Sequence, residues 1–376
     1  MTDQFRIKIA QLNPTVGDLQ GNAAKAKQAW LQGAEQGSDF VTLPEMFITG
    51  YNTQDLVMKP AFQNDAMNAV RELAKECADG PALGIGGPWV EDGALFNAYF
   101  ILNGGDIQAI VKKHHLPNET VFDEVRIFEP GQVSGPYVIN GVRIGSPVCE
   151  DAWHSDVVET LEETGAEFLF IPNGSPYYRG KLDVRLNLMV SRVVESGLPL
   201  IYLNLTGGQD DQIFDGCSFA LNPGGELAAM LPMFEESITE LILNRTDQGW
   251  RIADTLKSKI PDQLEADYHA MTIALRDYCA KSGFGKVLLG LSGGVDSALV
   301  ATIAADALGA ENVRCIMLPS EYTSDESLTD AKDMAENLGC RYDYLPIAEG
   351  RAAITNTLAP LFEGTNPDLT EENIQS

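Results

Sequence analysis

Short apolar runs that alternate with helical segments constrain the fold of this chain more than any other feature. Residues 40–43, 167–172 and 200–203 are apolar almost throughout and too short for a helix, which is typical of strands buried on both faces. A helical pattern over residues 181–196 ends at Gly197, as helices often do at glycine. Such strands need a covering layer of helices, so the pattern predicts an α/β fold with mixed sheets.

Composition limits the classes of protein that this chain can belong to. Its 376 residues exceed what one hydrophobic core usually organises, so two domains are expected. With 54 acidic and 26 basic residues the net charge is −28, which argues against a nucleic-acid-binding protein. No apolar run reaches membrane-spanning length, and nothing before Phe5 resembles a signal peptide. We therefore expect a cytoplasmic protein without membrane contact.

The cysteines and histidines give little sign of metal binding. The six cysteines are scattered without a Cys-x-x-Cys pair, and the four histidines form no recognised ligand pattern. The sequence therefore predicts free thiols in a reducing compartment, with neither a zinc site nor a disulfide framework.

A lone cysteine, Cys149, follows an apolar run over residues 142–148 that Gly145 and Pro147 interrupt. A thiol at the junction of a buried strand and a loop has a fixed backbone and an open approach, which suits a nucleophile. Most free cysteines are only small buried apolar side chains, so this stretch alone leaves both interpretations open.

Two charged residues also follow predicted strands. Glu45 comes after residues 40–43, beside Phe47. Aromatic neighbours would desolvate its carboxylate and raise its pKa toward the range of a general base. Lys113 comes after residues 106–112, the second strand of a hairpin predicted from an Asn-Gly-Gly turn. The alternatives are a surface carboxylate at a helix start and a solvated loop lysine.

Three segments together, LPEMFITGY, KHHLPN and SPVCEDAW, resemble the Glu–Lys–Cys triad of the nitrilase, or carbon–nitrogen hydrolase, superfamily. The resemblance implies an α-β-β-α sandwich that hydrolyses amides. Glu45 would take the proton from Cys149, and Lys113 with a backbone N–H near Glu150 would stabilise the oxyanion. The rival is a papain-like pair of Cys149 with His154, but it lacks an Asn or Asp partner at a recognised spacing.

Within this superfamily, VFDEVRIFEPG, NGSPYYRGK, GGQDDQIFDGCSF and NPGGE resemble the glutaminase domains of glutamine-dependent NAD synthetases. By that resemblance Glu124 supports the triad and contacts the substrate amide, and Ser175 and Lys181 bind the α-carboxylate of glutamine. Asp215 and Gly216 are expected to serve a structural turn. Phe122 would line the pocket. The implied glutamine-binding residues are Phe122, Glu124, Ser175 and Lys181.

Residues 286–300 read as an apolar strand, a glycine turn spelled SGGVDS and a helix start. Successive amides at such a turn, backed by a helix N-terminus, form an anion site, although no Walker GK[ST] is present. Predicted helices over 297–308 and 325–338 alternate with predicted strands over 313–318 and 342–347. This order predicts a doubly wound parallel sheet with the nucleotide at the carboxyl ends of its strands.

The sequence SGGVDS resembles the pyrophosphate loop of the N-type ATP pyrophosphatases. The resemblance implies that ATP and Mg²⁺ bind there, with Asp296 as a metal ligand. LPSEYTSDESLTDA and ENIQS resemble NAD synthetase in particular, and Ser327 is expected either near the nucleotide or at a plain helix start. The implied ATP-binding residues are Ser292, Gly293, Gly294, Asp296 and Ser297.

The resemblances predict a glutaminase domain over residues 1–246, a linker over 247–261 and a synthetase domain over 262–376. Glutamine would supply ammonia through an enclosed path, and ATP would adenylate deamido-NAD, so that ammonia yields NAD, AMP and pyrophosphate. They also imply a homo-oligomer. Because the resembling family continues past Ser376, we expect an incomplete doubly wound ATP-pyrophosphatase domain, which would put its activity in doubt.

Three alternatives to this function remain open at the level of sequence. One is another amidotransferase of the same ATP-dependent class, and another is a free-standing amidase with a decayed partner domain. The third is a non-catalytic assembly module that binds nucleotide without turnover. Release of ammonia from glutamine separates the last from the others.

Overall fold

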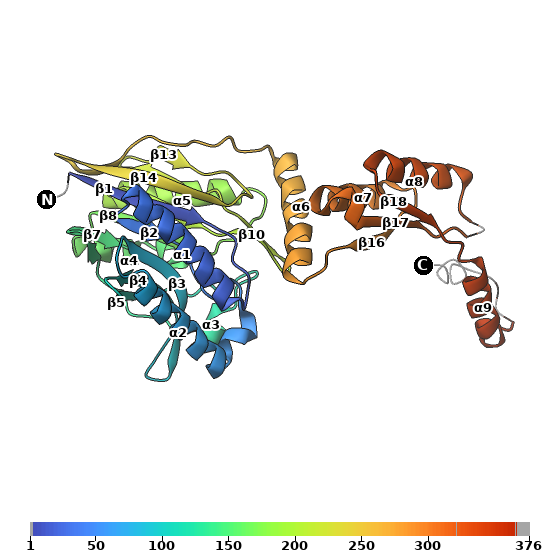
Figure 1. Cartoon of the computed structure of the whole chain (residues 1–376), viewed down its shortest axis with the longest axis horizontal. Coiled ribbons are helices and arrows are strands. Elements are labelled where there is room, and N and C mark those ends of the chain that lie inside the picture. The colour runs from blue at the N-terminus through green and yellow to red at the C-terminus, as the bar shows by residue number, and fades with distance from the viewer. Residues whose placement is uncertain (1–2, 321, 365, 367–376) are drawn as a thin grey trace. The chain divides into compact units, whose positions relative to one another are not determined.

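The computed structural model describes residues 3–320, 322–364 and 366 (Figure 1). The chain divides into two compact units, Met1–Ala270 and Met271–Ser376, and the division falls inside helix α6 (Gln263–Lys281). The segment ENIQS lies outside the described residues. Among the described helices, none combines the length and apolar character that crossing a membrane requires.

The first unit contains a seven-stranded mixed sheet, with strands β1 (Gln4–Gln11), β2 (Phe40–Thr42), β3 (Ala82–Glu91), β4 (Ala94–Asn103), β5 (Asp106–Lys112), β14 (Ser237–Thr246) and β15 (Gly249–Ile252). Their order is β15-β14-β1-β2-β3-β4-β5. β1, β2 and β3 are parallel, as crossover helices allow, whereas β3, β4 and β5 are antiparallel, and β4 with β5 forms the predicted hairpin.

A six-stranded sheet faces it, with strands β6 (Tyr137–Ile139), β7 (Val142–Gly145), β8 (Phe168–Asn173), β9 (Leu200–Asn204), β12 (Phe219–Asn222) and β13 (Glu226–Met230). Their order is β13-β12-β9-β8-β7-β6, with β7, β8 and β9 parallel. The apolar runs predicted as buried strands supply the centre of this sheet: every residue of β8 and β9 is buried.

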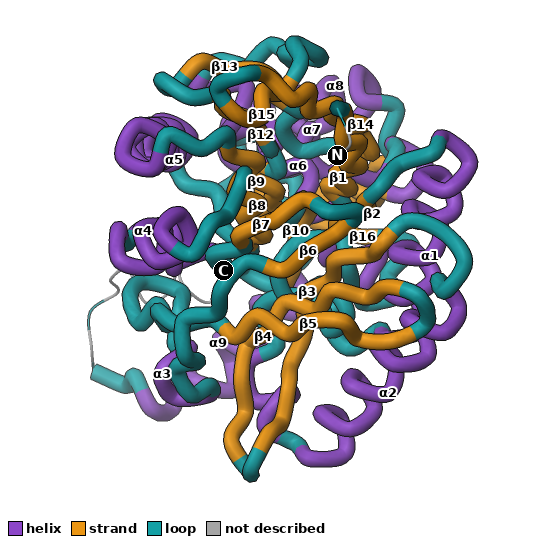
Figure 2. Tube along the Cα trace, turned by 90° about the vertical axis from the view of Figure 1, so that its left-hand side faces the viewer, coloured by secondary structure: helices purple, strands orange, loops and turns teal. Residues whose placement is uncertain are grey.

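Helices cover the outer faces of both sheets, so the first unit has the predicted α-β-β-α layers. Figure 2 shows α1 (Leu19–Gln36) and α2 (Pro60–Glu76) on one side, and α4 (Ser155–Glu163) and α5 (Lys181–Ser196) on the other. One hydrophobic cluster joins the facing sides of the sheets, as Ile7 and Phe170 illustrate. Two further clusters join each sheet to its helices.

The glycines of β3 permit a close approach of neighbouring segments. A Cβ atom on Gly86 would lie 2.2 Å from the backbone nitrogen of Met46, and one on Gly84 would lie 2.4 Å from the hydroxyl of Tyr99. No side chain fits in such gaps. The glycines therefore let the turn that carries Glu45 pack directly on β3.

The second unit contains a three-stranded parallel sheet in the order β16-β17-β18. The strands are β16 (Val287–Gly290), β17 (Val313–Met317) and β18 (Arg341–Tyr344), and the helices that follow them are α7 (Val295–Leu308), α8 (Asp325–Leu338) and α9 (Ala348–Leu358). The predicted strand–helix alternation is present, and α7 and α8 pack on β17 around small residues such as Ala301 and Ala331. The side-chain cap of α8 is Ser324, whose hydroxyl accepts a bond from the backbone N–H of Ser327.

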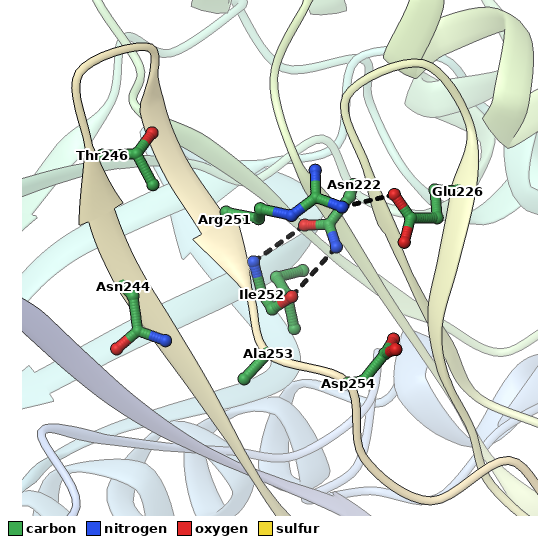
Figure 3. A pocket seen from close by; sticks show the side chains of 8 residues that line it. All are labelled: Asn222, Glu226, Asn244, Thr246, Arg251, Ile252, Ala253 and Asp254. Atoms are coloured by element: carbon green, nitrogen blue, oxygen red, sulfur yellow. Dashed lines mark hydrogen bonds and ion pairs between the residues drawn. The ribbon is translucent and has the colours of Figure 1, made fainter.

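The prediction of a linker over the whole of residues 247–261 is wrong. β15 pairs with β14, a strand that the sequence analysis did not identify, and Trp250 and Ile252 are buried in the core of the first unit. Figure 3 shows Asn222 fixing this hairpin: its side chain bonds the backbone N–H and C=O of Ile252, at 2.8 and 2.9 Å. Further along, the backbone N–H of Ser258 donates to the carbonyl of Met230.

The stretch of residues 212–222 is divided between two sheets. β11 (Gln212–Asp215) pairs only with β10 (Thr206–Gln209), whereas the following residues join β12. Gly216 and Cys217 have φ values of 65° and 51°, which turn the chain between them. The structural turn expected at Gly216 is confirmed.

Candidate active site

Glu45, Lys113 and Cys149 come from distant segments but share one environment. Glu45 follows β2, Lys113 follows β5, and Cys149 begins the short helix η2 (Cys149–Trp153) that follows β7. Their exposed fractions are only 1%, 1% and 4%. Burial of an ammonium and a carboxylate is tolerated only when they are paired, so their partners decide what the site can do.

The carboxylate of Glu45 is held through both oxygens. Its Oε1 accepts bonds of 2.8 Å from Lys113 Nζ and from Asn97 Nδ2, and its Oε2 accepts a 2.8 Å bond from the backbone N–H of Gly174. These donors come from the loop after β5, from β4 and from the end of β8, so the carboxylate is fixed between the two sheets.

Lys113 lies between two carboxylates. Its Nζ is 2.8 Å from Glu45 Oε1 and 2.8 Å from Glu124 Oε2, and all three side chains are almost fully buried. Burial disfavours the ammonium, but Glu124 and Glu45 outweigh that effect and raise the pKa of Lys113 well above its usual value. The two carboxylates therefore favour the charged, ammonium form of Lys113.

Glu124 begins the short helix α3 (Glu124–Ile127) and completes this buried group. Its Oε1 accepts bonds from Tyr51 Oη at 2.8 Å and from Asn97 Nδ2 at 3.1 Å. Burial raises the pKa of Glu124, while the charge of Lys113 opposes that shift. The amide of Asn97 thus bridges the two carboxylates that flank the ammonium.

Cys149 has a left-handed backbone, with φ of 48°, which is uncommon and strained for a residue other than glycine. Burial, followed by the charge of Glu45, raises the pKa of its thiol well above the usual value, and Lys113 acts in the opposite direction. The resting group is therefore a thiol, and an adjacent base must remove its proton before it can attack.

Asp151 fastens the Cys149 segment to the Lys113 segment. This buried carboxylate accepts bonds from the backbone N–H groups of His114 and His115, at 2.9 and 2.7 Å, and from Val148 at 3.0 Å. The loop after β5 and the start of η2 are therefore held in one fixed arrangement.

Ser175 and Lys181 belong to a neighbouring part of the same unit. Ser175 Oγ accepts a 3.1 Å bond from Arg185 Nε. Arg185 also forms a buried ion pair with Asp215, whose two oxygens each lie 2.8 Å from Nη1. Asp215 thus serves an ion pair, beyond the turn expected for it. Phe122 packs on the ring of Tyr51, with the centroids 6.2 Å apart.

The ammonium of Lys181 faces aromatic rings, 4.3 Å from the centroid of Trp153 and 4.8 Å from that of Tyr178. Within the described part of the chain, no carboxylate lies within ion-pair distance of it. Burial, together with Arg185, lowers the pKa of Lys181, while Cys149 and Glu150 act in the opposite direction. Lys181 is therefore a largely buried cation within electrostatic reach of the thiol.

The predicted ATP-binding residues form one loop of the second unit, between β16 and α7. The hydroxyls of Ser292 and Ser297 lie 3.0 Å apart, and the N–H of Gly294 points to Ser292 Oγ at 3.3 Å. Gly293 has φ of 83°, and a Cβ there would lie 2.4 Å from the carbonyl oxygen of Ser327. Ser327 therefore lies beside this loop as well as in the first turn of α8. Asp296 is exposed at the start of α7.

Comparison with known proteins identifies both halves of the chain. The Carbon-nitrogen hydrolase family matches residues 6–249, and the NAD synthase family matches residues 268–376. A glutamine-dependent NAD(+) synthetase of Rhodobacter capsulatus is 57% identical over the whole chain, which covers 68% of that relative. The chain belongs to the glutamine-dependent NAD(+) synthetase family.

Other members of the family support the same assignment. A glutamine-dependent NAD(+) synthetase of Thermotoga maritima is 34% identical, with 99% of this chain and 70% of the relative aligned. The structure of glutamine-dependent NAD+ synthetase from Acinetobacter baumannii in complex with ADP superposes with a TM-score of 0.94 at 33% identity, covering 99% of this chain and 70% of that one. The resemblances to the carbon–nitrogen hydrolase superfamily and to NAD synthetase are confirmed, as is the predicted enzyme class. The comparisons favour it over the free-standing amidase, the other amidotransferases and the assembly module.

Sequence reasoning missed several residues that build the site. Asn97 is the single polar residue in the apolar run LFNAYF, and this was a usable signal of a buried polar role. Asp151, two residues after Cys149, gave no pattern of its own. Arg185 reads as an ordinary helix-surface residue, although its side chain is 1% exposed.

The pH dependence of Cys149 alkylation tests the electrostatics of this site. Without substrate, iodoacetamide should react slowly at neutral pH and faster as the pH rises, because only the thiolate reacts and burial and Glu45 raise the thiol pKa. Glu45→Gln removes a neighbouring negative charge and should move the midpoint of the rate profile to lower pH. The midpoint is measured by mass spectrometry of the modified peptide.

Glu159→Gln is the matched control for this measurement, because Glu159 is an exposed carboxylate on α4 and its removal should leave the midpoint in place. An unchanged or higher midpoint in Glu45→Gln would contradict the electrostatic account of Cys149.

Proposed function

We propose that the first unit hydrolyses glutamine with Cys149 as nucleophile, Glu45 as general base and Lys113 as the stabiliser of the oxyanion. We further propose that the ammonia released amidates deamido-NAD, which the second unit activates with ATP. The observation that carries the first proposal is the buried contact of 2.8 Å between Lys113 and Glu45, both within electrostatic reach of the buried thiol of Cys149.

The reaction begins when Glu45 takes the proton of Cys149 as the sulfur attacks the amide carbon of glutamine. The carbonyl oxygen becomes an oxyanion, which Lys113 and a backbone N–H near Glu150 stabilise. Collapse of this intermediate breaks the C–N bond, and Glu45 returns the proton to the departing ammonia. Water, deprotonated by Glu45, then hydrolyses the thioester to glutamate and frees the thiol.

Glu124 supports this cycle electrostatically. Glu45 alternates between its ionised and protonated forms, so Lys113 loses one of its counter-ions during part of each turnover. Glu124, 2.8 Å from the same ammonium, keeps the positive charge paired at that stage. We infer that Glu124 holds Lys113 in position and also contacts the amide of the substrate.

Lys181 is proposed to bind the α-carboxylate of glutamine. A buried ammonium with aromatic neighbours and no paired carboxylate in the described structure leaves its donors available for an anion. Ser175 would assist from a position set by Arg185, and Phe122, packed against Tyr51, would line the pocket.

In the second unit, the loop from Ser292 to Ser297 is proposed to bind the phosphates of ATP. Its position at the carboxyl end of β16, before the N-terminus of α7, suits an anion site. The relative of known structure from Acinetobacter baumannii was determined with ADP, which supports a nucleotide site in this family. The loop would orient ATP for adenylation of deamido-NAD, and ammonia would then displace AMP to give NAD.

The residues at this loop fit a magnesium ion. Asp296 offers an exposed carboxylate in the first turn of α7, next to the proposed phosphate site, and Mg²⁺ in proteins is usually held by one or two carboxylates together with substrate phosphates. When bound, the ion would neutralise phosphate charge. Asp296 would hold it, while the serine hydroxyls and glycine amides would orient the phosphates.

Several wider features of the function stay predictions. We propose that residues 1–246 act as the glutaminase and 262–376 as the synthetase, although the strand β15 places part of the segment between them in the first unit. The six free cysteines support a reducing, cytoplasmic location. The homo-oligomer can be checked by light scattering, and the enclosed ammonia path by competition with labelled external ammonium.

Replacement of the nucleophile tests the first proposal. Cys149→Ala should lower the release of ammonia from glutamine by at least about a thousandfold, because no thiol remains to form the thioester. Formation of NAD from deamido-NAD, ATP and added ammonium should persist in the same variant. Cys77→Ala, at another buried free cysteine of the first unit, is the control. Glutamine-dependent activity that survives in Cys149→Ala would refute the assignment.

Removal of the proposed carboxylate-binding cation tests the glutamine site. Lys181→Met should raise KM for glutamine by roughly tenfold to a hundredfold, since a hydrogen bond to a charged group is lost, and should change kcat less. Hydrolysis of a neutral primary amide without an α-carboxylate should not respond. Lys27→Met, at a partly exposed lysine of α1, is the control. An equal loss for both substrates would show that Lys181 acts elsewhere.

Asp296→Asn tests the metal proposal in the second unit. The variant should need at least about tenfold more Mg²⁺ for cleavage of ATP to AMP and pyrophosphate, because one anionic ligand is lost. Its glutaminase activity should be unchanged. Asp333→Asn, at an exposed aspartate of α8, is the control. An unaltered Mg²⁺ requirement would remove Asp296 from the metal site.

A further inference from the structure

Three of the four histidines of the chain gather beside the active-site segments. The rings of His114 and His115 meet edge to face with centroids 4.6 Å apart, and His115 stacks on His154 at 3.9 Å. Asp156, in the first turn of α4, completes the group: its two oxygens lie 3.0 and 3.1 Å from His115 Nε2. The residues come from segments about forty positions apart in sequence, which only the fold brings together.

The hydrogen bonds of His114 determine which ring nitrogen is available. Its Nδ1 lies 2.7 Å from the carbonyl oxygen of Gly131. A carbonyl can only accept, so Nδ1 carries the hydrogen and Nε2 of the neutral ring keeps a free lone pair. A histidine that donates one N–H to a backbone carbonyl while its other nitrogen stays open is the usual arrangement of a metal ligand.

We propose that His114, His115 and Asp156 bind a divalent cation of the Zn²⁺ type. One potential ligand atom from each residue lies within 4.8 Å of the other two. In a tetrahedral zinc site with bonds of about 2.0–2.1 Å, ligand atoms lie roughly 3.3 Å apart. His115 Nε2 and the oxygens of Asp156 are already close to this spacing. The side chain of Asp156 is 57% exposed, so it is free to rotate until its carboxylate reaches the same spacing from His114. Two imidazoles and a carboxylate leave one position for water.

The backbone beneath this site is already rigid. The N–H groups of His114 and His115 both donate to the buried carboxylate of Asp151, so binding does not have to order the two histidines first. Imidazole nitrogens select Zn²⁺ and similar ions over Mg²⁺, which prefers oxygen ligands. This cation site is therefore separate in chemistry and in place from the Mg²⁺ proposed at Asp296, and it does not depend on the proposed function.

Bound at this place, the cation would tie together two of the three segments that carry the triad, those of Lys113 and Cys149. Lys113 immediately precedes His114. Asp156 lies in the first turn of α4, the helix that follows η2, and η2 begins at Cys149. The bridge would add to the one that Asp151 makes. We infer that the cation stabilises the first unit, and we expect a higher melting temperature in its presence.

Titration of the untagged chain with Zn²⁺, by calorimetry in competition with a chelator, tests the proposal. We expect one site per chain that Mg²⁺ does not occupy, and visible absorption bands of a tetrahedral Co²⁺ site when Co²⁺ replaces Zn²⁺. Asp156→Asn and His115→Gln should each weaken binding by at least about tenfold and remove the Co²⁺ bands. Asp156 is exposed, so its variant should fold normally, as melting without metal will verify.

Two controls separate this site from other Zn²⁺ ligands of the chain. His269→Gln, at the remaining histidine, should leave the affinity unchanged, because His269 lies on α6 beside Glu265. Cys149→Ala should also retain binding. Absence of Zn²⁺ binding, full affinity in both Asp156→Asn and His115→Gln, or loss of binding in Cys149→Ala would each overturn the proposal.

Discussion

The pairing of the buried ammonium of Lys113 with two carboxylates is the interaction on which the rest of the candidate active site depends. Removal of such a charge from water costs several kcal/mol, and only close pairing offsets it. Glu45 and Glu124, each 2.8 Å away, provide that pairing, and Asn97 holds both carboxylates. Because the ammonium must be paired, the segments at β2, β4, β5 and α3 that carry these four side chains have to meet around it. It also explains why β3 carries glycine at position 86, where a side chain would displace the turn that holds Glu45.

The facing sheet is fixed to this point by a second set of buried charges. Asp151 joins the start of η2 to the loop after β5, and the pair of Arg185 with Asp215 fixes the loop that carries Ser175. Neither group has to contact the substrate to matter. Each sets the position of a segment that bears a proposed catalytic or binding residue. The geometry of the site therefore depends on side chains that are not themselves proposed to contact the substrate.

The parts of this structure that the sequence predicted are those with a local cause. Helix α5 has the predicted bounds because an amphipathic pattern ends at Gly197, and Glu45, Lys113 and Cys149 follow strands whose apolar character is plain in the sequence. The residues that the sequence did not reveal depend on partners that are far away along the chain. Asn97 meets Glu45 across 52 positions, and Arg185 meets Asp215 across 30. The spacing of the histidines along the chain likewise gave no sign of their convergence.

Anionic substrates and a strongly acidic chain are compatible because short-range interactions decide binding. The net charge of −28 repels glutamine carboxylate and ATP at long range, but at physiological ionic strength exposed charges are screened within about 8 Å. A buried cation is screened far less. Lys181, with its ammonium over Trp153, is a local and fixed feature of this kind. A chain with few cations can therefore still bind anions, provided that each site places its positive groups where water cannot shield them.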